Sequence, residues 1–174
     1  MKNSPQVAVM MGSKSDLPNL KRAFEIFKDF GVCYEARVMS AHRTPHDAAK
    51  FAGEAEKNGI KVIICAAGMA AHLAGVVAAH TTVPVIGIPM ACEPFNGLDA
   101  LLAMVQMPPG IPVATVTAGK SGADNAALLA VSILALSDES LSKKLKEFRV
   151  KQSDKVMAAD AELQAIIKAG GIPQ

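Results

Sequence analysis

The chain is poor in aromatic side chains and in excess charge of either sign. Aromatic residues make up 4% of its 174 residues, with no tryptophan and one tyrosine, so it offers few platforms for stacking nucleic-acid bases. Its 18 lysines and arginines against 16 acids leave a net charge of +2, which gives no long-range attraction to nucleic acid or to a membrane surface. We therefore expect neither nucleic acid nor a membrane as a partner.

Cysteines and long hydrophobic runs are also scarce. Cys33, Cys65 and Cys92 are widely spaced and form no Cys-x-x-Cys pair, so neither a disulfide framework nor a zinc site is expected. Unpaired thiols are typical of a cytoplasmic protein. The apolar run at residues 7–11 is too short for a signal peptide or a membrane span. The sequence thus predicts a cytoplasmic protein that holds no metal.

What the sequence does have is a hydrophobic share of 51%, distributed over alternating strand-like and helix-like segments. Short apolar or alternating runs predict five strands, at residues 7–11, 34–38, 62–67, 85–88 and 113–117. Helices are predicted at residues 17–30, 45–58, 97–105 and 123–136, and a turn that enters a small-residue helix at 68–75. Because strands that alternate with helices form parallel sheets, we expect a three-layer α/β fold with a doubly wound, five-stranded parallel sheet. Residues 1–174 would form a single domain with its core at 7–136.

The C-terminal region predicts one long helix, at about residues 138–168. Apolar residues recur there at alternating steps of three and four, from Leu141 to Ile166. A helix of about 30 residues would be about 45 Å long, which exceeds the span of a domain of this size. Because such a stripe needs a partner surface, we expect it to rest on a neighbouring subunit. The alternative is a helix that breaks near Ser153 and Asp154 and folds back.

Polar side chains follow two of the predicted strands. Residues 11–16 have the sequence Met-Gly-Ser-Lys-Ser-Asp, and residues 40–45 have the sequence Ser-Ala-His-Arg-Thr-Pro. The carboxyl ends of parallel strands meet at one edge of the sheet, where the backbone N–H groups that open the next helix attract anions. The two turns therefore predict a pocket for a phosphorylated small molecule, with the titratable side chain of His42 beside it.

The first of these turns has the residue types that a sugar phosphate needs. Gly12 permits close approach of the backbone, and Ser13 and Ser15 can donate hydrogen bonds to phosphate oxygens. Asp16 would repel a phosphate and is better suited to accept hydrogen bonds from sugar hydroxyls. The alternative is that Ser15 and Asp16 only cap a helix, since they are preferred capping residues.

The second turn combines a hydroxyl, an imidazole and a guanidinium. Arg43 offers a planar fork of donors that suits phosphate or carboxylate, and Ser40 adds a hydroxyl. Because histidine takes and releases protons near neutral pH, His42 is the candidate acid or base. Thr44 is expected to cap the following helix, with Pro45 in its first turn.

A third segment, residues 66–75, is built of small residues around one imidazole and suits a flat ring. Whether His72 contacts a ligand or packs behind the site stays open on the sequence alone. His46 and His80 are expected to be solvated. Residues 92–93, Cys-Glu, could border the pocket, although nothing near them indicates a nucleophile.

Residues 114–121 match a loose form of the nucleotide-binding P-loop. The residues before Ala118 are mostly β-branched and predict a strand, and no later strand is predicted that could supply a magnesium-binding aspartate. We therefore reject a P-loop at this position.

Residues 11–16, 40–45, 67–75 and 106–116 together resemble one family, the N5-carboxyaminoimidazole ribonucleotide mutases of bacterial purine synthesis. The resemblance extends from residue 7 to about residue 136. It implies a small-molecule ribonucleotide substrate whose carboxyl group moves from an exocyclic nitrogen to the adjacent ring carbon, with no cofactor and no metal. It also implies a homo-oligomer, typically an octamer, in which the C-terminal helix reaches a neighbour.

Site roles follow from the resemblance motif by motif. It implies that Ser13, Ser15, Ser40 and Arg43 surround the phosphate, that Asp16 binds the ribose hydroxyls, that His42 is the acid/base, and that Gly68, Met69, Ala70, His72 and Leu73 cover the imidazole. The family commonly has glycine where this chain has Met69, a departure that bears on closure of the third loop.

Two other functions stay open. One is the direct carboxylation of aminoimidazole ribonucleotide with carbon dioxide, a branch from which Arg43 and residues 70–72 distinguish this chain. The other is a non-catalytic nucleotide-binding module of flavodoxin-like shape.

Overall fold

The structure is a computed structural model that describes residues 4–172. The chain divides into two compact units, one ending at Leu134 and the other beginning at Ala135. Because the candidate pocket belongs entirely to the first unit, that unit is described first.

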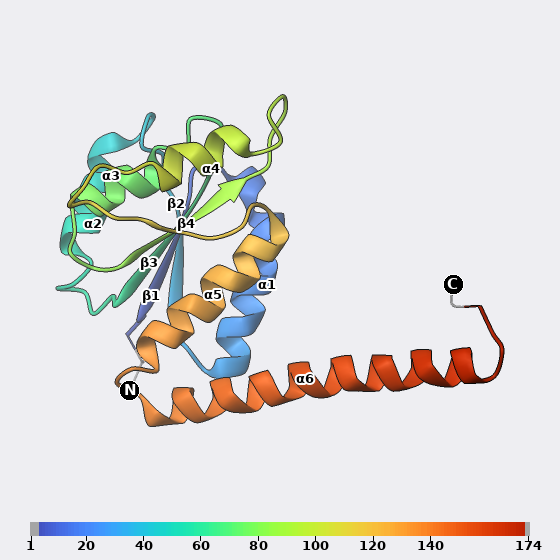
Figure 1. Cartoon of the computed structure of the whole chain (residues 1–174). Helices are drawn as coiled ribbons and strands as arrows, with labels where there is room; N and C mark the ends of the chain where they lie inside the picture. Colours follow the sequence, from blue (N-terminus) through green and yellow to red (C-terminus); the bar gives the residue numbers. More distant parts are fainter. Residues whose placement is uncertain (1–3, 173–174) are drawn as a thin grey trace. The chain divides into compact units, whose positions relative to one another are not determined.

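A five-stranded parallel sheet in the order β2-β1-β3-β4-β5 forms the centre of the first unit. Its strands are β1 (Val7–Met11), β2 (Tyr34–Val38), β3 (Val62–Gly68), β4 (Val85–Met90) and β5 (Ala114–Thr115). The helices are η1 (Lys14–Asp16), α1 (Leu17–Phe30), α2 (Pro45–Glu54), α3 (Leu73–Ala79), α4 (Leu98–Val105) and α5 (Lys120–Leu134). Helices α1 and α5 cover one face of the sheet, and α2, α3 and α4 cover the other (Figure 1). The predicted doubly wound, three-layer fold is confirmed.

Continuous apolar strands at the centre of the sheet explain why both of its faces are covered. Every residue of β1 and β4 is buried, as is every residue of β3 except the last, Gly68. Such strands must be covered on both sides, which requires crossover helices and therefore parallel pairing. Alanines such as Ala48 and Ala52 on α2 bring the helix backbone close to the sheet, beside Met10 and Ile63.

The strand order places a crevice where the predicted site residues lie. From β1 the chain moves outward to β2 and then returns past β1 to β3, so the connections that leave β1 and β3 diverge. In open parallel sheets, ligands bind beyond the carboxyl ends of the strands at such a reversal. The turns after β1, β2 and β3 meet at this edge.

The bounds of several elements differ from those predicted. Strand β5 has two residues instead of five, because Pro89 in its neighbour β4 has no N–H to donate to a longer ladder. The chain still follows β4 irregularly, with hydrogen bonds from Val116 N to Gly87 O (3.0 Å) and from Gly119 N to Pro89 O (2.9 Å). Strand β4 itself extends two residues beyond the prediction, to Met90.

Two helices also differ at their ends. Helix α2 ends at Glu54, and the predicted remainder forms tighter turns in which Ala55 N donates to Ala52 O (3.3 Å). Gly59 then closes the segment in the left-handed region, with φ of 85°. Helix α5 spans Lys120–Leu134, whereas the sequence predicted residues 123–136.

The second unit contains α6 (Glu139–Lys168), one uninterrupted helix of 30 residues. Asp138 caps it by accepting a hydrogen bond from Leu141 N (3.1 Å). The helix continues through Ser153 and Asp154, so the alternative of a broken helix is wrong. Its exposed apolar side chains include Val150, Val156, Met157, Leu163, Ile166 and Ile167. Across residues 4–172, no helix is both long and apolar enough to span a bilayer.

Candidate functional site

The turns after β1, β2 and β3, together with the residues just after β4, line one pocket of about 540 Å³. Every residue that the sequence assigned to a ligand lies on it: Ser13, Ser15, Asp16, Ser40, His42, Arg43, Gly68, Met69, Ala70, His72 and Leu73. Gly12 and Cys92 line it as well, as the sequence suggested, and the structure adds Ala41 and Ala67. These two alanines have no side-chain chemistry that a sequence reading could single out. The structure thus brings the predicted residues together, and their roles toward a ligand stay predictions.

The first turn is stabilised by its own hydroxyls and carboxylate. Ser13 caps η1 by accepting hydrogen bonds from Ser15 N (3.2 Å) and Ser15 Oγ (2.8 Å). Ser13 N in turn donates to Asp16 Oδ2 (3.1 Å), which completes a capping box. Capping is therefore a real role of this turn, although the capping residue is Ser13 and the same side chains also face the pocket.

Asp16, the last residue of this turn, has a half-buried carboxylate. Burial raises its pKa above the ordinary value, and the hydrogen bond from Ser13 N opposes that shift. Burial has the larger effect because desolvation disfavours the charged form more than a single backbone donor favours it. A carboxylate held in this way gains from additional donors, such as the hydroxyls of a bound sugar.

The second turn is closed by Thr44 and tied to the first by Arg43. Thr44 Oγ1 accepts from Ser40 N (2.9 Å) and donates to Ser40 O (3.1 Å). Thr44 is the N-cap residue of α2 and Pro45 lies in the first turn, as predicted, but the Thr44 side chain makes no capping hydrogen bond to the helix. Arg43 Nη2 donates to Gly12 O (2.8 Å), which places the guanidinium between the two turns. Hydrogen-bond donors from both turns therefore lie close together.

The third loop depends on a glycine and on a strained methionine. A Cβ on Gly68 would lie 2.6 Å from Cys92 Sγ and 3.2 Å from Met90 O, so only glycine fits there without movement of its neighbours. Met69 follows with φ of 57°, in the left-handed region that favours glycine. Its side chain is 61% exposed and lies on the pocket, where it adds apolar surface that a glycine would lack.

The two pocket imidazoles contact one another. His42 Nε2 and His72 Nδ1 are 2.8 Å apart, and the rings meet edge to face at 84°. His72 lies at the N-terminus of α3, so its position follows from the turn after β3. The sequence left its role open; the structure places it on the pocket and against His42. His46 and His80 are exposed, as expected, and do not line this pocket.

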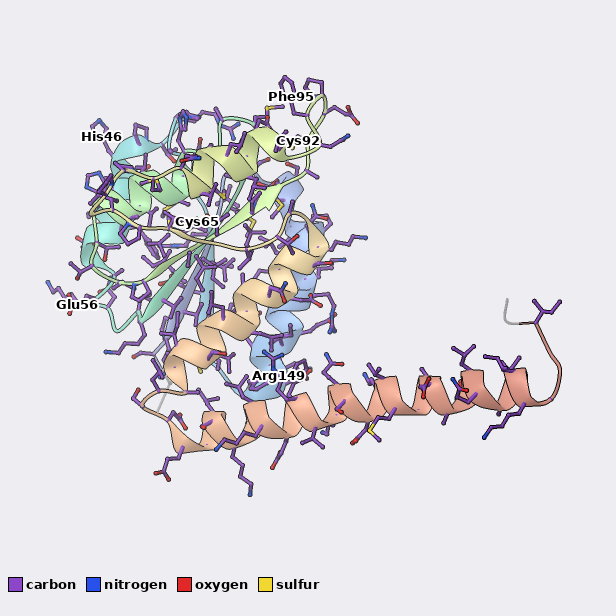
Figure 2. The ribbon with its side chains drawn as sticks, in the orientation of Figure 1. His46, Glu56, Cys65, Cys92, Phe95 and Arg149 are labelled. Atoms are coloured by element: carbon purple, nitrogen blue, oxygen red, sulfur yellow. The ribbon has the colours of Figure 1, made fainter. Side chains whose placement is uncertain are left out.

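The three cysteines have different environments. Cys65 is fully buried in β3, and burial raises the pKa of its thiol, which makes it unreactive (Figure 2). Cys92 follows β4 and borders the pocket, as the sequence suggested, whereas Glu93 does not line it. All three thiols are unpaired. Within residues 4–172, no cluster of three or more His, Cys, Asp or Glu side chains could hold a metal ion.

A second hollow, of about 660 Å³, lies at the opposite edge of the sheet. It is lined by residues 78–85 and 110–112, with Gly53 and Glu56. One of its hydroxyls, Thr81 Oγ1, already accepts a hydrogen bond from Val83 N (3.2 Å). Because it lies at the amino ends of the strands, it lacks the converging turns of the first pocket. We therefore place the candidate site at the carboxyl edge.

Asp16→Asn should stabilise the ligand-free protein at neutral pH. An asparagine oxygen can still accept from Ser13 N, while the cost of a half-buried charge disappears. Since the folded-state pKa of Asp16 lies above its unfolded value, its contribution to stability falls as the pH rises from about 4 through the folded pKa. The gain from asparagine should be below about 1 kcal/mol, because solvent screens a group of this exposure.

Thermal unfolding of both proteins at pH 4 and pH 7.5 checks this expectation. The difference in Tm should be present at pH 7.5 and shrink toward pH 4. Asp160→Asn, at an exposed site in the middle of α6, is the matched control and should show little change between the two values. An equal gain at both pH values would mean that desolvation of Asp16 is not its source.

Comparisons of the sequence and of the fold identify similar known proteins. A sequence model of the AIR carboxylase family matches residues 6–155. The N5-carboxyaminoimidazole ribonucleotide mutase of Saccharolobus solfataricus is 53% identical over 158 residues, which cover 91% of this chain and 99% of the relative. The enzyme of that name from Escherichia coli K12 is 50% identical over 155 residues, covering 89% and 92%. The crystal structure of Treponema denticola PurE matches with a TM-score of 0.82 at 31% identity, covering 91% and 98%.

Proposed function

This chain belongs to the AIR carboxylase family, and on that basis we propose that it is an N5-carboxyaminoimidazole ribonucleotide mutase acting at the pocket described above. The enzyme is an isomerase of purine biosynthesis. It moves the carboxyl group from the exocyclic nitrogen to the adjacent ring carbon, which gives 4-carboxy-5-aminoimidazole ribonucleotide. The observation that carries this proposal is the convergence of all predicted site residues on one pocket at the strand reversal.

The first two turns form the phosphate end of the proposed site. Ser13, Ser15 and Ser40 contribute hydroxyls, and Arg43 lies between the turns through its bond to Gly12 O. Guanidinium and hydroxyl donors directed at one point suit a phosphate dianion. Asp16, which lines the same pocket, would accept hydrogen bonds from the ribose hydroxyls, and these would offset the cost of its partial burial.

The third loop forms the end that covers the imidazole. Gly68, Ala70 and Leu73 present backbone and apolar surface, and Met69 extends over the pocket. A carboxylated amine readily loses carbon dioxide, so the enzyme must retain that molecule beside the ring carbon. An enclosure of small apolar groups does this by excluding water and restricting diffusion.

Proton transfer is assigned to His42. As the bond between the exocyclic nitrogen and the carboxyl carbon breaks, the bonding pair stays on nitrogen, which takes a proton from the imidazole. The ring carbon then attacks carbon dioxide, and its proton passes back to the imidazole as the ring regains aromaticity. The proton count is unchanged over the cycle, as an isomerisation requires.

Incubation of the purified chain with each carboxylated ribotide tests the proposed function. Interconversion in both directions, without ATP or added bicarbonate, is the expected result. Consumption of aminoimidazole ribonucleotide with bicarbonate, and no use of the carboxyamino compound, would instead show the carboxylase reaction that the family name describes. If calorimetry shows saturable binding of a ribotide but no product forms, the chain is a non-catalytic binding module.

The assembly and the location belong to the same proposal. The exposed apolar residues of α6, such as Val156 and Ile166, are suited to contact a neighbouring subunit, and the proposed assembly is an octamer. Sedimentation at micromolar concentration should give a mass of several chains, and a mass of one chain would contradict the proposal.

The three unpaired cysteines are in keeping with a cytoplasmic location.

A further inference from the structure

Two histidines from different turns share one hydrogen bond inside the pocket. His42 belongs to the turn after β2, and His72 lies at the start of α3, 30 residues later. The distance of 2.8 Å between His42 Nε2 and His72 Nδ1 requires that one nitrogen carry the proton and the other accept it. We propose that His42 and His72 act together as one proton carrier. His72 holds Nε2 of His42 by a hydrogen bond and supplies it with a proton, while Nδ1 of His42 exchanges a proton with the substrate. This inference rests on the proposed function of His42.

The contact decides which nitrogen of His42 is available to a ligand. Nε2 is occupied by His72, whereas Nδ1 makes no hydrogen bond to any of residues 4–172 in the structure. The backbone of the same residue is held separately, since His42 N donates to Ser40 Oγ (3.3 Å). An imidazole fixed at its backbone and at one ring nitrogen presents the other nitrogen in a defined direction.

The pair can pass a proton through the ring without releasing it to water. With three protons on its four ring nitrogens, the pair carries one positive charge. Nδ1 of His42 gives its proton to the exocyclic nitrogen as the nitrogen–carbon bond breaks, and the proton on His72 Nδ1 moves to His42 Nε2. When the ring carbon later loses its proton to His42 Nδ1, the proton on Nε2 returns to His72. Every proton and electron pair is accounted for, and no outside acid is needed.

The surroundings suit a carrier that alternates between charged and neutral forms. The Asp16 carboxylate and the Arg43 guanidinium line the same pocket from the first and second turns. The anionic ligand adds a phosphate and a carboxylate. The positive form of the pair would therefore face negative charge on the ligand.

His72→Gln tests the proposal, because the glutamine amide can hydrogen-bond to His42 Nε2 but cannot carry a proton through its side chain. We expect kcat to fall on the order of a hundredfold, the usual contribution of a positioned acid or base, with KM changed by less than about threefold. His72→Ala should lose activity similarly and recover part of it when free imidazole is added. His80→Gln, at the other end of α3, is the matched control and should keep the wild-type kcat.

The outcomes separate this inference from the function on which it rests. If the wild-type chain does not interconvert the ribotides, both fail. If the wild type is active and His42→Asn is not, a wild-type kcat in His72→Gln overturns the carrier alone. A raised KM with unchanged kcat would make His72 a ligand contact, and it would equally overturn the proposal, as would an absence of rescue by imidazole. Circular dichroism confirms that each variant is folded.

Discussion

His42→Asn should lower turnover by about three orders of magnitude while ribotide binding persists. Asparagine keeps a polar side chain of similar reach but neither takes nor releases a proton in this pH range. Positioned acid–base groups typically contribute 10²–10⁴-fold, and in the proposed mechanism the same group acts in both halves of the cycle. The proposed phosphate and ribose contacts come from other residues of the pocket, so affinity should change little.

Steady-state assays in both directions measure the loss, and calorimetry with the ribotide measures binding. His46→Asn is the matched control, since His46 is exposed on α2, four residues along, and does not line the pocket. That variant should retain the wild-type kcat. Wild-type turnover in His42→Asn would remove the imidazole from the mechanism, and loss of binding in the same variant would make His42 a substrate anchor instead.

Gly122→Ala should strongly destabilise the first unit. A Cβ on Gly122 would lie 1.9 Å from Thr117 O and 3.0 Å from Ile88 Cγ2. The first of these atoms is backbone, in the turn that joins β5 to α5, so it cannot move aside as a side chain would. Overpacking of this kind costs about 3 kcal/mol, which corresponds to a Tm lower by roughly 6–12 °C for a chain of this size.

Thermal and urea unfolding at one fixed protein concentration measure this effect, since association would otherwise shift Tm. Gly53→Ala is the matched control, because it too replaces a helical glycine, and the added Cβ would meet only His80 O at 3.7 Å. That substitution should raise stability by about 0.5–1 kcal/mol. Equal stability of the two variants would mean that the start of α5 does not lie against Thr117.

Most of the fold could be predicted because its signals are local. Buried runs such as Val7–Met11 and the helical spacing of α1 (Leu17–Phe30) each reflect one element and its covered face. The length of β5 could not be predicted in the same way. It depends on Pro89 in the neighbouring strand β4, which has no N–H to donate. The sequence of β5 itself does not reveal this missing hydrogen bond.

In the candidate site, too, local features could be predicted from the sequence, whereas contacts between separate segments could not. Ser13 and Arg43 could be placed at one edge because each follows a predicted strand. Their actual partners, Asp16 for Ser13 N and Gly12 O for Arg43, depend on side-chain directions that the sequence does not specify. The contact between His42 and His72 is of this kind as well, since it joins two turns whose relative position is set by the strand order.

Within the turn after β1, several donors and acceptors already bond to one another. An incoming anion competes with Ser13 Oγ for the Ser15 donors and with Asp16 for Ser13 N. Chloride or a lone carboxylate offers too few acceptors to compensate for the loss of these bonds, whereas a phosphate monoester presents three oxygens at once. The turn would therefore be selective: it would bind a phosphate ester but not the abundant monovalent anions of its surroundings.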